Sequence, residues 1–98
     1  MIVPKYILSP NAVLSLKKIS TYTLKTHGEQ QQRRYINELQ ERFRYLAGHP
    51  KYGKPRDDLK ADYLSHPQGL HMIYYRVISD RVEIIDVLHQ SMDAQLHL

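Results

Sequence analysis

Six histidines give this 98-residue chain its widest choice of chemistry: His27, His49, His66, His71, His89 and His97. An imidazole can ligate a metal, or act as a general acid or base near neutral pH. No two of these histidines have the i, i+4 spacing that brings two ligands to one helix face, and no cysteine can complete a zinc site. A glycine-rich phosphate loop and a Gly-x-Ser-x-Gly turn are also absent. The sequence therefore predicts no metal and no cofactor.

Metal-free RNA cleavage is the one reaction that the residue types support, because it needs a base, an acid and cations around the scissile phosphate. The strands predicted near the C-terminus carry suitable groups: His71, Tyr74, Tyr75, Arg76 and His89. The segment before them adds four cations: Lys51, Lys54, Arg56 and Lys60. No spacing fixes two of these groups to one phosphate-sized site. Packing is therefore the favoured interpretation, and a ribonuclease site is the alternative.

Two amphipathic helices are predicted in the N-terminal half. Ser9-Pro10 is typical of a helix start, because serine caps unpaired amides and proline suits the first helical position. The apolar face of the first helix, over residues 11–26, consists of Ala12, Leu16, Ile19 and Thr23. We expect Gly28 to end it in the left-handed conformation. The second helix runs from residue 29 to Gly48, with an apolar row of Tyr35, Ile36, Leu39, Phe43, Leu46 and Ala47. The short connection predicts an antiparallel helical hairpin.

The rest of the chain is predicted to form strands and a loop. Residues 5–8 are a candidate edge strand, and residues 50–62 indicate a surface loop with little regular structure. A short strand over 63–66 ends at Pro67-Gln68-Gly69, and strands 70–78 and 82–89 form an antiparallel hairpin. The expected fold class is α+β in two layers within a single domain, residues 1–98. An N-terminal strand and a helical hairpin precede a three-stranded antiparallel sheet that completes a small sheet.

The last strands are apolar on both faces, whereas two helices can cover only one. Leu70, Met72, Tyr74 and Ile78 share one face of the first strand, and Ile73, Tyr75 and Val77 share the other. A half-solvated strand would alternate apolar with polar residues. The second face therefore needs a cover, which is either a partner protein or the loop 50–62 together with the C-terminal tail. In the tail, Met92 and Leu96 are the candidate apolar anchors.

Charge and composition narrow the class of protein. The formal net charge is +4, which is ordinary for a small domain and is also compatible with nucleic acid or an acidic protein partner. No apolar run reaches the roughly 20 residues of a membrane helix. The N-terminus shows no signal-peptide pattern. A cytoplasmic protein is expected.

The C-terminal third resembles the ParE toxins of the RelE/ParE superfamily. Residues 63–77, from Tyr63 to Val77, are similar to the second and third strands of these toxins. Residues 82–93 are similar to the last strand with its Leu-His-x-x-Met-Asp ending. The helix start at Ser9-Pro10 and the loop positions Pro50, Gly53 and Leu59 also fit the family. The resemblance covers nearly the whole chain and implies the α+β fold expected above.

The resemblance implies a toxin of a type II toxin–antitoxin system, neutralised by a cognate antitoxin. ParE members inhibit DNA gyrase and serve plasmid stabilisation, whereas RelE members cut mRNA on the ribosome. The residues after His89 include no tyrosine, lysine or arginine, which favours the ParE branch. The implied protein is then not an enzyme and has no catalytic residues, and it meets nucleic acid only through gyrase or the antitoxin. The RelE-type endonuclease and a weakly toxic ParE-like module are the alternatives.

Two sets of contact residues follow from the resemblance. The predicted antitoxin-binding residues are Val13, Leu14, Lys17, Leu24, Tyr74 and Ile84. The predicted gyrase-contact residues are Tyr74, Arg76, His89, Ser91, Met92 and Asp93. Basic residues such as Lys17, Lys18, Arg33 and Arg34 are expected to steer an acidic antitoxin. Leu64 stands where many relatives have arginine, which bears on toxic potency.

Overall fold

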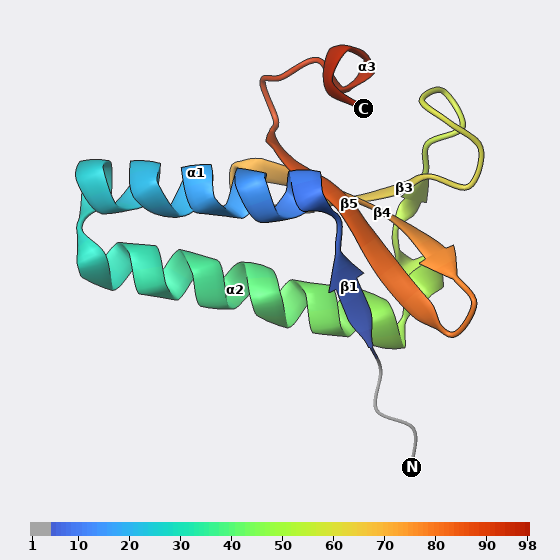
Figure 1. The fold of residues 1–98 in the computed structure, drawn as a ribbon, viewed down its shortest axis with the longest axis horizontal. Helices are drawn as coiled ribbons and strands as arrows, with labels where there is room; N and C mark the ends of the chain where they lie inside the picture. The colour runs from blue at the N-terminus through green and yellow to red at the C-terminus, as the bar shows by residue number, and fades with distance from the viewer. Residues whose placement is uncertain (1–4) are drawn as a thin grey trace.

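The computed structural model describes residues 5–98. The expectation that the N-terminus has no signal-peptide pattern concerns residues that lie largely outside this range. The chain begins with β1 (Tyr6–Leu8), α1 (Pro10–His27) and α2 (Glu29–Gly48). It continues through the 3₁₀ turn η1 (Pro50–Tyr52), β2 (Lys54–Pro55), β3 (Leu64–Gln68), β4 (His71–Ile78), β5 (Arg81–His89) and α3 (Ala94–His97). This is the predicted order of strand, helical hairpin and strands (Figure 1).

One five-stranded sheet has the order β1-β5-β4-β3-β2. The N-terminal strand β1 is an edge strand and runs parallel to β5, while the other neighbouring strands are antiparallel. The hairpin of α1 and α2 packs on one face of the sheet (Figure 1). The two-layer α+β fold and the edge strand are therefore confirmed.

Local signals explain where α1 begins and ends. The Ser9 hydroxyl accepts a 3.0 Å hydrogen bond from the Ala12 amide, and Pro10 occupies the first turn. Gly28 alone connects α1 to α2, with φ 89° and ψ 173°. Its φ is positive as predicted, but its ψ is extended rather than left-handed helical. This region is essentially restricted to glycine, and here it reverses the chain within one residue.

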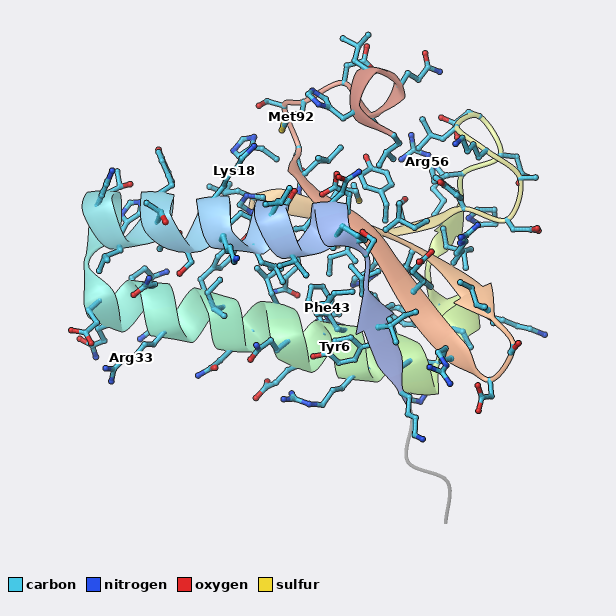
Figure 2. The ribbon with its side chains drawn as sticks, viewed as in Figure 1. Tyr6, Lys18, Arg33, Phe43, Arg56 and Met92 are labelled. Carbon is cyan, nitrogen blue, oxygen red and sulfur yellow. The ribbon has the colours of Figure 1, made fainter. Side chains whose placement is uncertain are left out.

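The predicted apolar faces of both helices form the main core. Its buried members are Ala12, Ile19, Leu39, Phe43, Leu46, Ile73, Tyr75, Val82, Ile84 and Val87. Tyr6 from β1 meets Phe43 from α2 edge-on, with ring centroids 5.4 Å apart (Figure 2). An edge-to-face pair of this kind adds about 0.5–1.5 kcal/mol to the burial of the rings.

A bulge in β5 explains why this strand is apolar on both faces. Tyr75 lies opposite Ile84 and Tyr74 opposite Asp86, which leaves Ile85 without a residue opposite it. The extra residue reverses the inward and outward alternation along β5. Val82, Ile84 and Val87 therefore all face the helices, although their spacing is not regular. Ile85 and Leu88 belong to a second cluster on the other face.

The chain itself supplies a cover for that second face. Tyr74, Leu88 and Ala94 form the buried cluster, with Leu59, Met72, Ile85 and Leu98 packed around it. Leu59 comes from the loop after β2, and Ala94 and Leu98 come from the C-terminal tail. The loop and the C-terminal tail, one of the two covers considered from the sequence, therefore lie over this face.

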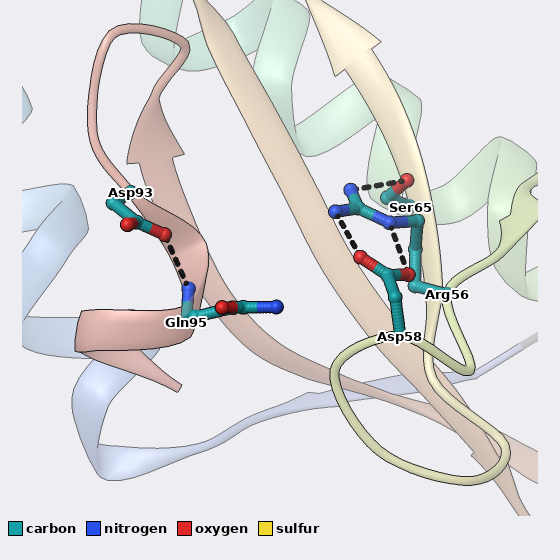
Figure 3. Close-up of polar contacts among 5 residues, drawn as sticks. All are labelled: Arg56, Asp58, Ser65, Asp93 and Gln95. Atoms are coloured by element: carbon teal, nitrogen blue, oxygen red, sulfur yellow. Dashed lines mark hydrogen bonds and ion pairs between the residues drawn. The ribbon is translucent and has the colours of Figure 1, made fainter.

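The predicted anchors of the tail are wrong. Met92 is 40% exposed and Leu96 is 80% exposed, whereas Ala94 is 8% exposed. The reason is the short helix α3, which starts where the Asp93 carboxylate accepts a 3.0 Å hydrogen bond from the Gln95 amide (Figure 3). The helical turn directs Ala94 toward the sheet and Leu96 away from it.

Arg56 fastens the loop over the second face. Its guanidinium donates to both carboxylate oxygens of Asp58 at 3.0 Å and to the Ser65 hydroxyl at 3.5 Å (Figure 3). It also lies 5.7 Å from the centre of the Tyr74 ring. The predicted loop 50–62 thus contains a 3₁₀ turn, the short strand β2 and a fixed arginine.

The prediction that Pro67-Gln68-Gly69 ends β3 is wrong, because β3 continues to Gln68. β2 pairs only with Ser65 and Leu64, so Pro67 lies on a stretch of β3 whose outer edge is unpaired. Proline is tolerated at such an edge. The turn falls instead at Gly69, which has a φ of 57°.

Tyr75 joins the core to the segment after α2. Its ring is fully buried, and its hydroxyl donates to the Pro50 carbonyl at 2.9 Å and accepts from the Gly53 amide at 2.8 Å. A Cβ at Gly53 would stand 2.2 Å from this hydroxyl, so only glycine fits there. The hydroxyl therefore fixes where the chain leaves α2 and enters β2.

We predict that Tyr75→Phe lowers the free energy of unfolding by about 1–3 kcal/mol, because it leaves a buried amide and a carbonyl without a partner. Urea unfolding followed by circular dichroism measures the change. Tyr22→Phe is the matched control, since Tyr22 is 66% exposed. Equal loss in both variants would contradict a structural role for the Tyr75 hydroxyl.

Candidate binding groove

A groove lies between α1 and the ends of β4 and β5, and we call it the α1 groove. It consists of two cavities of about 370 and 450 Å³ that share Lys18, Ile19, His71 and His89. The first cavity extends along α1 to Leu14, and to Met92 in the tail. The second extends the other way, to Tyr22 and Tyr35. Figure 2 shows Lys18 on the side of α1 that faces the segment with Met92.

His71 and His89 lie side by side in this groove. They are opposite each other in the β4–β5 ladder, and their ring centroids are 5.5 Å apart at an interplanar angle of 79°. The sequence spacing did not indicate this pair, because the bulge at Ile85 determines which residue of β5 meets His71. Without the extra residue, the pairing of Tyr75 with Ile84 would place Leu88 opposite His71.

Tyr35 holds the His71 ring from the α2 side. Its hydroxyl donates to the Gln68 carbonyl at 3.0 Å and lies 2.5 Å from Nδ1 of His71. Since the phenol has one proton, Nδ1 of His71 carries a hydrogen and donates to the phenol oxygen. This assignment leaves Nε2 of His71 as a hydrogen-bond acceptor. Burial raises the pKa of Tyr35 and keeps it neutral.

His89 presents the opposite tautomer. Its Nδ1 accepts a 3.1 Å hydrogen bond from the Ser91 amide, and the Ser91 hydroxyl lies 2.7 Å away. The ring hydrogen is therefore on Nε2. The pair thus combines one acceptor nitrogen on His71 with one donor nitrogen on His89.

The side chains that line the groove include more basic groups than acidic groups. The groups that can become cations are Lys18, His27, His71, His89 and His97, and the acid is Asp86. Asp86 is buried, and one of its oxygens accepts from the Ser15 hydroxyl at 2.5 Å and from the Val87 amide at 2.8 Å. Burial, and then the nearby His89, lower the pKa of His71. Within residues 5–98 no cluster of three or more side chains could hold a metal ion.

The predicted antitoxin-binding residues are not gathered at one place. Leu14 is 55% exposed and lines the groove. Lys17 lies at a shallow hollow beside it, while Val13 and Leu24 are exposed without lining the groove. Ile84 is 0% exposed and offers no contact surface, because β5 directs it into the helix-facing core.

Tyr74, predicted for both partners, is 5% exposed and also offers almost no surface. Its ring lies in the second cluster beneath Arg56 and the tail. Both strand residues were expected to be exposed because the sequence does not show which segments cover them.

The other predicted gyrase-contact residues fall into two places. His89 and Met92 line the groove, and Ser91 and Asp93 are exposed beside them. Arg76 is separate, five residues further along β4, and its Nε donates to Glu83 at 2.8 Å. At about 3.3 Å per residue this is roughly 16 Å from His71.

Leu64 is half-buried and packs against the main core. An arginine with the same orientation would need to extend past this packing to reach solvent. Leu64 therefore contributes to the packing of the main core.

Sequence reasoning missed Lys18 as a groove residue, together with Ser15, Tyr35 and Asp86. A signal for Lys18 existed, since Asn11, Leu14, Ser15, Lys18 and Tyr22 form an i, i+3, i+4 row beside the apolar face of α1. Tyr35 carried no such signal, because it meets His71 across 36 positions of the chain.

Solved structures with the same arrangement of helices and strands define the fold class. A chromosomal ParDE TA system from P. aeruginosa aligns with a TM-score of 0.74 at 12% identity, covering 89% of this chain and 96% of that one. The toxin–antitoxin complex RelBE2 from Mycobacterium tuberculosis aligns with a TM-score of 0.66 at 21% identity, covering 91% and 100%. The chain thus has the fold shared by these small toxin–antitoxin proteins.

Sequence similarity identifies the family. The model of the ParE toxin of the type II toxin–antitoxin system parDE matches residues 6–94. Toxin ParE1 of Caulobacter vibrioides is 44% identical over 93 residues, which cover 95% of this chain and 96% of that protein. Toxin ParE1 of Mycobacterium tuberculosis is 33% identical over 95 residues, covering 96% and 97%. The chain belongs to the ParE toxin family of type II toxin–antitoxin systems, as its residues predicted. Within residues 5–98, no helix is long and apolar enough to cross a membrane.

We predict that stability falls as the pH drops below about 6.5, the ordinary pKa of histidine. The pKa values of His66 and His71 are lowered in the folded chain, mainly by burial. Below about pH 6.5 the unfolded chain binds protons that the folded chain resists, so unfolding is favoured. The loss of stability levels off once the pH is below the pKa values that His66 and His71 have in the folded chain.

Urea unfolding at pH 7.5, 6.5 and 5.5 tests this dependence. His71→Gln should reduce the loss of stability between pH 6.5 and 5.5, because His66 alone then contributes. The two proteins are compared by how steeply the free energy of unfolding changes with pH. Absolute stabilities are not compared, since the substitution also removes the hydrogen bond to Tyr35. Identical slopes in the two proteins would contradict the assignment to His71.

Proposed function

We propose that this chain is a cytoplasmic toxin that inhibits DNA gyrase and is neutralised by a cognate antitoxin. The supporting observation is membership of the ParE family along nearly the whole chain, with a 44% identical relative that is a ParE1 toxin. The resemblance of the C-terminal strands and the Leu-His-x-x-Met-Asp ending supports gyrase rather than the ribosome as the target. We assign the protein an inhibitory action with no catalytic step of its own.

The α1 groove is the proposed antitoxin site. It is an open hollow with exposed Leu14 at one side and Lys18 at its centre, so it offers apolar contact and positive charge together. The solved neighbours are a ParDE system and a RelBE2 toxin–antitoxin complex, which supports a partner of the same kind for this chain. Val13, Lys17 and Leu24 are proposed to extend the contact along α1.

We predict that Leu14→Asp weakens antitoxin binding at least about tenfold, because it places a charge at an apolar contact. Isothermal titration calorimetry with the antitoxin encoded beside this chain measures the affinity. Leu96→Asp is the matched control, since Leu96 is an exposed leucine on α3 that does not line the groove. Equal affinities for the two variants would place the antitoxin elsewhere.

The proposed gyrase-contact surface is the tail next to His89, with Ser91, Met92 and Asp93. These side chains are exposed and neighbouring, whereas Arg76 lies apart and is the weaker candidate. Purified protein without antitoxin should inhibit supercoiling by gyrase and accumulate cleaved DNA. Absence of both effects with folded protein would contradict the proposed target.

We predict that Met92→Ala raises the concentration needed for half-inhibition of gyrase several-fold, because an apolar interface contact is truncated. Leu96→Ala, another exposed apolar residue of the tail, should leave inhibition unchanged. Circular dichroism of both variants checks folding. Loss of inhibition in the control alone would place the contact on α3 instead.

The ribonuclease alternative has one observation in its favour, the neighbouring rings of His71 and His89. The cations expected to assist them do not line the groove, and Arg56 is bound to Asp58 on the other sheet face. A cell-free translation reaction separates the two functions. Cleaved mRNA with His71-dependent activity would establish the endonuclease, whereas intact mRNA would exclude it. A weakly toxic module would neither cleave mRNA in this reaction nor inhibit supercoiling by gyrase.

A further inference from the structure

The histidine pair of the α1 groove has hydrogen-bonding capacity that the fold does not use. Nδ1 of each ring is engaged, by Tyr35 in one case and by Ser91 in the other. Within residues 5–98 no hydrogen bond is made by Nε2 of either ring. The unused nitrogens belong to residues that line both cavities of the groove, next to Lys18.

The charges around this position favour an anion. Lys18 from α1 is exposed and lines both cavities, and His27 and His97 stand at the two ends of the groove. Asp86, the acid in the lining, already accepts two hydrogen bonds from the chain. A negatively charged group would thus meet donors from Lys18 and His89, while one oxygen of the Asp86 carboxylate is already occupied by Ser15 and Val87.

We propose that Lys18, His71 and His89 bind a carboxylate side chain of the antitoxin, and that this contact takes up one proton on the histidine pair. The inference rests on the proposed antitoxin function. It adds the chemistry of the recognised group and a dependence of the complex on pH. A carboxylate suits the site because two imidazoles with ring centroids 5.5 Å apart can each donate from Nε2 once the second is protonated.

The direction of the pH effect follows from the groups that face His71. Burial, and then the nearby His89, oppose a cation at His71 in the unbound protein, and its pKa is lowered. The other titratable groups that line the groove are Lys18, Tyr22 and His27 from α1, Tyr35 from α2, Asp86 from β5 and His97 from α3. Tyr35 stays neutral, and Asp86 is held by Ser15.

A bound carboxylate reverses this balance, because an opposite charge within about 4–6 Å favours the protonated ring. A group whose pKa is raised by binding makes the affinity rise as the pH falls. The antitoxin should therefore bind more tightly at pH 6 than at pH 8, by up to about tenfold per pH unit for one proton taken up.

The first experiment uses acetate as a probe of the carboxylate site in the protein alone. Histidine ring resonances are followed by NMR from pH 5 to 8.5 in sodium acetate, and in sodium chloride of equal ionic strength. Acetate should raise the apparent pKa of His71 and move the resonances of His71 and His89. His66 is the internal control, since its pKa is also lowered by burial but it lies against Tyr52 outside the groove.

A phosphate arm at the same ionic strength distinguishes the ligand chemistry. A larger response to phosphate than to acetate would overturn the assignment of a carboxylate. A response of His66 equal to that of His71 would also overturn it, because the effect would then be non-specific.

The second experiment measures the dissociation constant of the antitoxin between pH 6 and 8. Wild type and His66→Gln should show tighter binding at low pH, and His71→Gln should show the same affinity at both pH values. A pH-independent affinity in wild type would refute the inference while leaving antitoxin binding intact. If acetate binds but the antitoxin does not, the result supports the carboxylate site and refutes the proposed neutralisation by an antitoxin.

Discussion

The pairing of β4 with β5, and the one extra residue at Ile85, is the constraint on which the rest of the structure depends. The bulge directs Val82, Ile84 and Val87 to the helices, and Leu88 to the opposite face. The same shift places His89 rather than Leu88 opposite His71. One irregular residue therefore sets both the division of the apolar residues between two clusters and the composition of the groove.

The sequence predicted the elements whose signals are local. Ser9-Pro10, the helical apolar rows and the hairpin of strands 70–78 and 82–89 correspond to observed elements, because capping, periodicity and turn chemistry act within a few residues. β2 was missed, since two residues carry no periodic pattern. α3 was missed for the same reason, and Leu96 was consequently assigned to the interior.

The groove could be predicted only in part, because it is assembled by long-range contacts. Leu14, His89 and Met92 were selected from the sequence and line it. The contact between Tyr35 and His71 joins α2 to β4, and the bulge that pairs the histidines has no sequence signal of its own. Tyr74 and Ile84 were predicted as contact residues because the sequence shows neither the bulge in β5 nor the segments that cover the sheet.

The parallel contact of β1 with β5 has a consequence for the order in which the site can form. Ser9 Oγ donates to the Ile85 carbonyl across 76 positions, and β1 pairs with residues 82–84. The helical hairpin, in contrast, is closed by Gly28 through contacts near in sequence. A chain still in synthesis can therefore complete both helices, but it has no α1 groove until its last strand is present. Any partner that binds this groove therefore selects molecules in which β1 has already paired with β5.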